Sequence, residues 1–171
     1  MDWRLEEAAI ETFYALGEYL GPLRKALVKL KYGNGRYLAP ALAAGLAGRL
    51  ADGDFAEAVL VPVPLHVKRQ RERGYNQSVL IARELGRELG VGVLEGGLRR
   101  VKQTQPQVGL TRVMRRANVR GAFVAEMEQV GGRDVVLVDD VATTGATVME
   151  CARACRKAGV RRIRIAVVAR G

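Results

Sequence analysis

Two adjacent carboxylates stand between an apolar run and a threonine-rich turn, and this segment has the residue types best suited to chemistry. Asp139 and Asp140 follow the apolar run Val135–Val138, which predicts a buried parallel strand. The next residues, Thr143–Thr147, predict the beginning of a helix, where unpaired backbone N–H groups and the helix dipole favour an anion. Gly145 lets the main chain approach a ligand closely, and the threonine hydroxyls add hydrogen-bond donors. The expected ligand of the turn is a phosphomonoester.

The two aspartates suit a sugar better than the phosphate itself. Carboxylates accept hydrogen bonds from sugar hydroxyls and also hold water bound to a divalent cation, and magnesium suits an oxygen-rich site beside phosphate. A ribose 5-phosphate unit meets both demands, so we predict Asp139 and Asp140 as catalytic residues and as indirect, water-mediated magnesium ligands. The predicted ribose 5-phosphate site comprises Asp139, Asp140, Ala142, Thr143, Thr144, Gly145, Ala146 and Thr147. The competing interpretation is a buried strand with an acidic end and a threonine-rich helix cap.

The segment Val135–Thr147 resembles the phosphoribosyl pyrophosphate signature of type I phosphoribosyltransferases, in which two acids and a TTG loop follow a hydrophobic strand. Further blocks, in order along the chain, are similar to the ComF family, also called competence protein F or amidophosphoribosyltransferase-like, which is associated with uptake of transforming DNA. These blocks are Lys31-Tyr32 with Gly33 and Gly35, Val61–His66, Arg71–Gln77, Gln103–Gln107 with Gly109-Leu110, Asn118-Val119 with Gly121–Phe123, and the acid and TTG segment. The resemblance implies a phosphoribosyltransferase fold with a small N-terminal helical hood over the site.

The same resemblance implies a pyrophosphate site at two basic segments. The turn Pro64–Gly74 follows the first core strand, and arginine suits bidentate contacts to phosphate. The basic segment from residue 99 to 120 resembles a mobile loop that closes over pyrophosphate in related enzymes. The pyrophosphate candidates are Pro64, His66, Arg71, Arg73, Lys102 and Arg112. A solvated basic surface is the competing interpretation of these residues, and His66 is also a weaker candidate for a general acid or base.

Cysteine usage departs from the pattern of many ComF proteins, which begin with a cysteine-rich zinc-binding segment. The cysteines of this chain are Cys151 and Cys155, and His66 is its only histidine. These residues cannot complete a closed Cys/His zinc site within one chain, so the zinc function is not carried over. The two cysteines lie four residues apart on a predicted helix and suit reduced, partly buried side chains better than a disulfide.

The elements predicted around these segments alternate between strands and helices. Strands are predicted at 58–63, 91–94, 121–125, 135–138 and 163–169, and helices at 76–89 and 147–158. This order favours a doubly wound, mostly parallel α/β sheet covered on both faces. The first 50 residues instead predict three helices, over 5–20, from 22 to about 30 and over 36–50, and residues 102–119 predict a long loop. We expect one structural domain, with a helical hood segment at 1–54 and a phosphoribosyltransferase-like core at 55–171.

Composition favours an anionic ligand. The 171 residues include 28 Lys or Arg and 18 Asp or Glu, which gives a formal net charge of +10 at pH 7. Seven basic residues and no acid lie between residues 96 and 125, and the last 21 residues hold seven more and no acid. Nucleic acid, phosphorylated metabolites and acidic membrane surfaces all fit this charge. Aromatic residues make up only 5% of the chain, so few side chains are present on which the bases of single-stranded DNA could stack.

Other patterns exclude some classes of protein. No uncharged stretch reaches the roughly 20 residues that span a bilayer, and the first residues have the wrong charge for a secretory signal, so we expect a cytoplasmic protein without membrane insertion. The sequence has no Gly-Lys pair for the P-loop of a nucleoside triphosphatase, and no G-x-G-x-x-G follows a strand.

Two hypotheses of function stay open. The first is a magnesium-dependent enzyme that binds phosphoribosyl pyrophosphate and transfers ribose 5-phosphate to an unknown acceptor. The second is a non-enzymatic accessory protein that binds single-stranded DNA and works with other proteins of the competence machinery.

Overall fold

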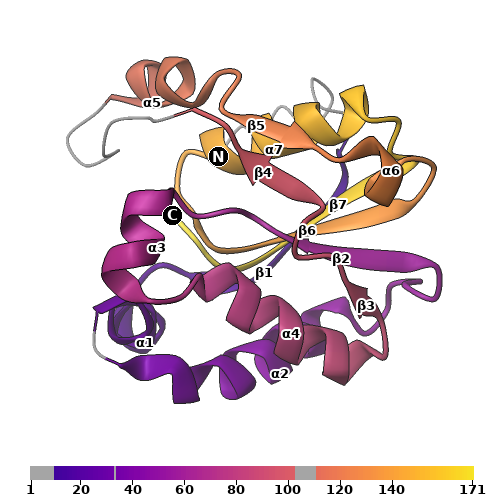
Figure 1. Ribbon diagram of the computed structural model, residues 1–171. Helices are drawn as coiled ribbons and strands as arrows, with labels where there is room; N and C mark the ends of the chain where they lie inside the picture. The colour runs from indigo at the N-terminus through magenta and orange to yellow at the C-terminus, as the bar shows by residue number, and fades with distance from the viewer. Residues whose placement is uncertain (1–9, 33, 103–110) are drawn as a thin grey trace.

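A five-stranded parallel sheet forms the centre of the computed structural model, which describes residues 10–32, 34–102 and 111–171 (Figure 1). The strands lie in the order β1-β7-β6-β2-β3, and every neighbouring pair is parallel. A separate antiparallel pair joins β4 to β5. The strands are β1 (Ile10–Glu18), β2 (Ala58–Pro62), β3 (Gly92–Val93), β4 (Leu98–Arg100), β5 (Phe123–Ala125), β6 (Asp134–Ala142) and β7 (Arg162–Arg170). The predicted α/β class with a mostly parallel sheet is confirmed.

Helices cover both faces of this sheet. They are α1 (Gly21–Tyr32), the short 3-10 helix η2 (Gly35–Leu38), α2 (Ala39–Leu50), α3 (Val67–Arg73), α4 (Gln77–Leu89), α5 (Arg112–Val119), α6 (Met127–Val130) and α7 (Ala146–Lys157). Figure 1 shows α1, α2 and α4 on one side of the sheet and α7 with the β4–β5 pair on the other. Successive residues of a strand face opposite sides, so Leu137 and Ile165 pack in the α7 layer, whereas Val136 and Ala166 pack in the layer of Leu85. Strands buried on both faces read as nearly continuous apolar runs.

The first strand departs from the sequence prediction. A helix is predicted over 5–20, but Ile10–Glu18 form β1, which pairs in parallel with β7. Phe13 packs in the α7 layer and Tyr14 in the opposite layer. A strand covered on both faces carries apolar residues at successive positions, and such a run also matches helical spacing, so the helix prediction is wrong here. The two helices predicted after it are present as α1 and as η2 with α2. Because β1 joins the central sheet, the division of the chain at residue 54 stays a proposal.

Most of the strands and helices predicted after residue 54 are present in the structure, although two segments predicted as a turn and a loop are helical. Val67–Arg73 form α3, where His66 Nδ1 accepts the Lys68 N–H at 3.2 Å as the helix cap. α5 begins in the same way, since the Thr111 hydroxyl accepts the Met114 N–H at 3.3 Å. Residues 103–110 of the predicted loop lie outside the described residues.

Cys151 and Cys155 are free cysteines on α7, and both are fully buried, where the sequence predicted partial burial. Burial raises the pKa of Cys155 to about 12. Within the ranges that the structure describes, none of the helices has the length and apolar character needed to cross a membrane.

Candidate functional site

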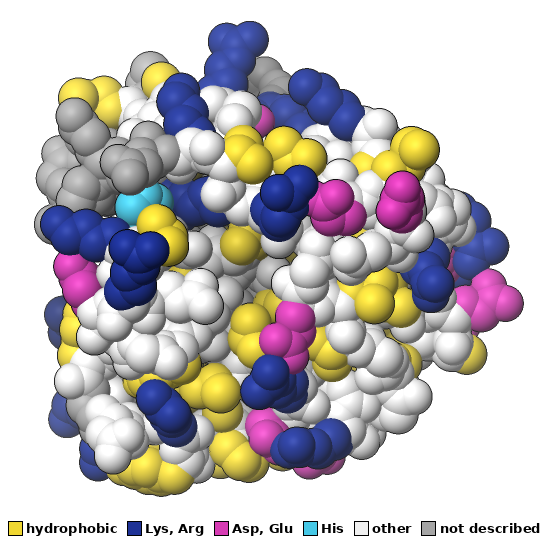
Figure 2. Space-filling view, viewed as in Figure 1, with side chains coloured by type: hydrophobic (Ala, Val, Ile, Leu, Met, Phe, Trp, Pro, Cys, Tyr) yellow, Lys and Arg dark blue, Asp and Glu magenta, His cyan; other side chains and the backbone are white. Residues whose placement is uncertain are grey.

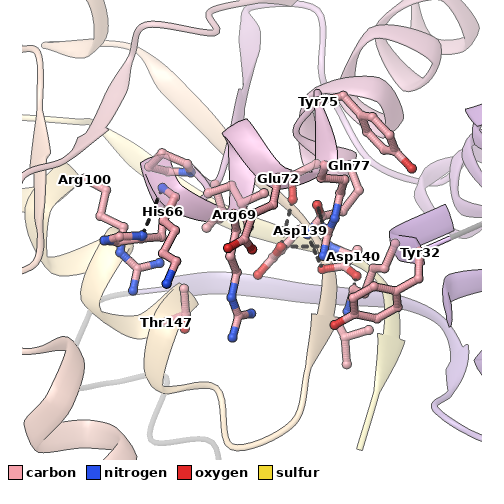
Figure 3. A pocket seen from close by; sticks show the side chains of 18 of the residues that line it. Tyr32, His66, Arg69, Glu72, Tyr75, Gln77, Arg100, Asp139, Asp140 and Thr147 are labelled. Atoms are coloured by element: carbon pink, nitrogen blue, oxygen red, sulfur yellow. Dashed lines mark hydrogen bonds and ion pairs between the residues drawn. The ribbon is translucent and has the colours of Figure 1, made fainter. Parts of the chain in front are cut away.

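A cleft of about 1070 Å³ opens at the carboxyl ends of β2 and β6 (Figures 2 and 3). Its walls come from α1, α3, the first turn of α4, β4 and the turn after β6. Figure 2 shows Lys and Arg side chains spread widely over the same face of the molecule. Because ligands of parallel α/β sheets bind at this edge, the cleft is the candidate functional site.

Asp139 lies at the bottom of the cleft and is buried. Its Oδ1 accepts hydrogen bonds from Ser78 Oγ at 2.8 Å and from the Asp140 backbone N–H at 2.9 Å. Burial, and then the adjacent Asp140 carboxylate, raise the pKa of Asp139 to about 7, while the bonds from Ser78 and the Asp140 amide and the charge of Lys31 oppose this rise. Burial beside a second acid thus disfavours the ionised form of Asp139.

Asp140 is held on both of its oxygens. Gln77 Nε2 donates to Oδ1 at 3.3 Å, and Lys31 Nζ forms an ion pair with Oδ2 at 2.5 Å. The side chains of Lys31 and Asp140 are only 20% and 6% exposed, so water screens the pair weakly. The C-terminal end of α1 and the N-terminal end of α4 thus meet on one carboxylate.

The first turn of α4 is itself tied to the central sheet. Asn76 caps the helix, since its side-chain oxygen accepts the Ser78 N–H at 2.9 Å. The Asn76 amide also donates to the Val63 carbonyl at 3.0 Å, just beyond β2. This double contact sets the position of Gln77 and Ser78 against the acid pair.

The turn between β6 and α7 forms a small hollow beside the cleft, of about 30 Å³. Gly145 has a φ of 70°, a left-handed conformation that glycine adopts without strain. The Thr144 hydroxyl accepts the Ala146 N–H at 3.5 Å at the start of α7. All eight residues predicted for ribose 5-phosphate line the hollow or the cleft: Asp139, Asp140, Ala142, Thr143, Thr144, Gly145, Ala146 and Thr147.

The predicted pyrophosphate residues are only partly brought together. Pro64, His66 and Arg73 line the cleft, whereas Arg71 and Lys102 are exposed and are not among its lining residues. The side chain of Arg112 lies outside the described part of the chain. Lys68 and Arg69, from the same basic segment, also line the cleft. The roles of these residues stay predictions.

The surroundings of His66 disfavour its charged form. Burial and then the charge of Arg100 lower its pKa, with smaller contributions from Arg69 and Lys68. Because Nδ1 accepts the Lys68 N–H, the imidazole proton resides on Nε2. In its neutral form the side chain thus has an N–H donor at Nε2, beside Arg100.

The lining residues that were not predicted for the site include Lys31, Gln77, Ser78 and Arg100. Lys31 and Gln77 belong to blocks that carry the ComF resemblance, so a signal for them existed. Arg100 comes from β4, and its guanidinium lies 5.4 Å from the ring centroid of Phe123. Burial lowers the pKa of Arg100, which lies beside His66 in Figure 3.

The two carboxylates fit a magnesium ion that is also held by water and by the phosphates of a bound ligand. Among the described residues, no group of three or more His, Cys, Asp or Glu side chains could hold a metal ion. Magnesium commonly keeps several waters and binds through one or two carboxylates together with substrate phosphates. Asp139 and Asp140 can meet such an ion through water, because their other contacts already hold them in place.

Comparison with known proteins first gives the class. Residues 75–171 match the phosphoribosyl transferase domain family. The structure of glutamine phosphoribosylpyrophosphate amidotransferase from B. subtilis complexed with ADP and GMP matches with a TM-score of 0.58 at 18% identity, over 83% of this chain and 30% of that one. A structure described as the allosteric regulatory enzyme of purine biosynthesis gives a TM-score of 0.57 at 17% identity, with the same coverage. The sheet, the acid pair before the Thr/Gly turn and the domain match thus define a type I phosphoribosyltransferase-like protein.

Sequence relatives narrow the class to a family. Competence protein F of Haemophilus influenzae is 35% identical over 96% of this chain and 75% of its own length. DNA utilization protein YhgH of Salmonella typhimurium is 33% identical over 88% of this chain and 68% of its own. Competence protein ComFC of Bacillus subtilis is 33% identical over 59% of this chain and 39% of its own. The chain belongs to the ComF family.

Proposed function

We propose that this protein binds phosphoribosyl pyrophosphate with magnesium and transfers ribose 5-phosphate to an acceptor. The observation that supports the proposal is the meeting, in one cleft, of the buried acids Asp139 and Asp140, the Thr/Gly hollow and the basic residues of α3 and β4. Each of these parts matches one part of the substrate: ribose hydroxyls, 5-phosphate and pyrophosphate.

In the proposed reaction, the bond between the ribose anomeric carbon and pyrophosphate breaks, and the acceptor bonds to that carbon. The hollow holds the 5-phosphate, and Asp139 and Asp140 accept hydrogen bonds from the ring hydroxyls, so the ribose is fixed while positive charge develops on it. Arg69, Lys68 and Arg100 stabilise the departing pyrophosphate. Magnesium, when bound, supplies further neutralisation of the pyrophosphate charge.

Calorimetry with phosphoribosyl pyrophosphate, with and without magnesium, tests the proposal. Wild-type protein should bind in the presence of magnesium, and an Asp139→Asn/Asp140→Asn double variant should lose at least about tenfold in affinity. Asp52→Asn, at an exposed acid outside the cleft lining, is the matched control. Equal and negligible heats in all samples would contradict the proposal.

The acceptor calls for a separate screen. The screen measures release of pyrophosphate from phosphoribosyl pyrophosphate in the presence of panels of nucleobases, amines and DNA. The acceptor class is the panel that accelerates this release with wild-type protein but not with the double variant. No acceleration with any panel would favour a binding role over a transferase.

A second candidate function is a DNA-binding accessory role in competence. It is favoured by the net charge of +10 and by the names of the relatives, which refer to competence and DNA utilization. Filter binding of single-stranded DNA across salt concentrations tests it, because release of counterions predicts a steep loss of affinity with salt. Absence of binding at low salt would exclude this role. Interaction with other competence proteins is a further part of this candidate function.

A further inference from the structure

Gln77 lies between two groups of opposite charge. Its Nε2 donates to Asp140 Oδ1 at 3.3 Å, and its Oε1 accepts from Arg73 Nη1. Gln77 is only 5% exposed, so little water competes for either end of the amide. Figure 3 shows the side chain beside Asp140 in the cleft.

The chemistry of a primary amide matches this position. Its carbonyl oxygen serves a cation and its NH2 group serves an anion, so one neutral side chain links a guanidinium to a carboxylate. The reversed amide would point N–H groups at Arg73 and an oxygen at Asp140. The two charged neighbours therefore fix the orientation of Gln77, and Gln77 in turn fixes Asp140.

Arg73 contacts Gln77 and the residue next to Lys31, and Gln77 and Lys31 are the two side chains that hold Asp140. Its guanidinium also lies 5.4 Å from the ring centroid of Tyr32, the residue after Lys31. Lys31 holds the second oxygen of Asp140 at 2.5 Å. Arg73 thus contacts both α1 and α4, the two elements that hold Asp140.

A separate group of basic residues lies elsewhere in the cleft. His66, Arg69 and Arg100 are close enough for their charges to influence one another. Figure 3 shows these three on one side of Asp139, with Gln77 and Tyr32 on the other. The cleft therefore has a basic end at these three residues, apart from Gln77, which accepts the Arg73 hydrogen bond.

We propose that Gln77 is a positioning residue that orients Asp140 towards the ribose, and that Arg73 acts through Gln77 instead of binding pyrophosphate. The inference rests on the proposed function and deepens it, because it changes the role of one pyrophosphate candidate. It assigns pyrophosphate to Arg69 and Arg100, and ribose to the unit of Arg73, Gln77 and Asp140.

Separate titrations with ribose 5-phosphate and with inorganic pyrophosphate, both with magnesium, test this division. Gln77→Met and Arg73→Met should each weaken ribose 5-phosphate binding about tenfold, the cost of a lost bond to a charged group, and change pyrophosphate affinity less than about twofold. The double variant should be no weaker than either single variant, because both act through one contact. Arg69→Met, on the same helix as Arg73, is the matched control and should weaken pyrophosphate binding instead.

Three results would overturn the inference: equal weakening of both ligands by Arg73→Met, additive losses in the double variant, or unchanged ribose 5-phosphate binding in Gln77→Met. Thermal unfolding of each variant shows whether it is folded. If Gln77→Met is not folded, Gln77→Glu replaces it, and if Arg73→Met is not folded, Arg73→Lys replaces it. Wild-type protein that binds neither ligand contradicts the proposed function itself. In that case the free energies of unfolding of the two single variants and the double variant decide whether Arg73 and Gln77 are coupled. If the losses of the two single variants add up in the double variant, the two residues are not coupled and the inference fails.

Discussion

Asp139 is a carboxylate buried beside a second carboxylate, and these two causes raise its pKa to about 7. The folded protein therefore keeps a proton that the unfolded chain, with an ordinary pKa near ~4, releases. Between about pH 4 and pH 7 the folded state binds more protons than the unfolded state, so its stability falls as the pH rises.

Asp139→Asn should remove this dependence, because the amide cannot ionise and still accepts the Ser78 hydrogen bond. The free energy of unfolding of the variant, relative to wild type, should rise by about 1 to 3 kcal/mol from about pH 5 to pH 8. Urea unfolding at several pH values measures it, with Asp52→Asn as the exposed control. Parallel pH profiles for Asp139→Asn and wild type would contradict the expectation.

Lys31 provides the positive charge that contacts Asp140, at 2.5 Å. Removing one partner of a poorly exposed ion pair leaves the other charge uncompensated. Lys31→Met should lower the free energy of unfolding by about 1 to 3 kcal/mol, less than for a fully buried pair because Lys31 is 20% exposed. Adding Asp140→Asn should recover most of the loss. Chemical denaturation measures both variants.

The control for Lys31 lies on the same helix. Lys25 is exposed on α1, so Lys25→Met should change the free energy of unfolding by less than about 0.5 kcal/mol. An equal loss in Lys25→Met and Lys31→Met, or no recovery in the double variant, would show that the ion pair is not the cause.

The element η2 packs directly on α1, and this packing depends on a glycine. A Cβ added at Gly35 would lie 2.6 Å from the carbonyl oxygen of Lys29 and 2.8 Å from the backbone nitrogen of Leu30. Since backbone atoms cannot give way easily, Gly35→Ala should cost about 2 kcal/mol or more. In α2, by contrast, nothing lies within 4 Å of a Cβ at Gly48, so Gly48→Ala should add about 0.5 to 1 kcal/mol through helix propensity. Urea unfolding of the two variants should give opposite signs, and equal signs would refute this account of the packing.

The sequence predicts helices that have one apolar stripe, and also strands that are fully buried on both faces, such as β2. α4 buries Ile81, Ala82 and Leu85 along one stripe, and this stripe is visible in the sequence. β1 has partly buried residues on both faces, so its apolar run fits a helix equally well. α3 buries no residue and shows no apolar period, and only its cap residues His66 and Gly74 mark its ends.

At the scale of the whole molecule, the contiguous half of the candidate site was predictable and the half assembled by folding was not. The acid pair and the Thr/Gly turn follow one another in the chain, so their spacing alone indicates their chemistry. Gln77 is 63 residues from its partner Asp140, and Lys31 comes from a different helix. Such contacts depend on the order of strands in the sheet, for which local patterns carry no signal.

The central sheet has the candidate site at the carboxyl ends of its strands and structural ion pairs at the amino ends. At the amino ends of β6 and β7, Asp134 is 1% exposed and accepts hydrogen bonds from Arg161 at 2.7 Å and Arg162 at 2.6 Å. Burial acts to raise the pKa of Asp134, but the bonds from Arg162 and Arg161 outweigh it and hold the pKa below its usual value. This arrangement stabilises the protein without taking part in the cleft.

Asp134→Asn should therefore affect stability alone. The variant should lose about 2 kcal/mol of unfolding free energy at neutral pH, because two arginines lose a charged acceptor. A depressed pKa contributes stability that is lost as the pH falls through the folded pKa, so the difference from wild type should shrink below about pH 4. Affinity for ribose 5-phosphate and pyrophosphate should stay within about twofold of wild type, since six residues of β6, or about 20 Å, separate Asp134 from Asp140. Weaker binding by a folded Asp134→Asn protein would contradict this expectation. It would mean that the acids of the cleft depend on the ion pairs at the amino end of their own strand, β6.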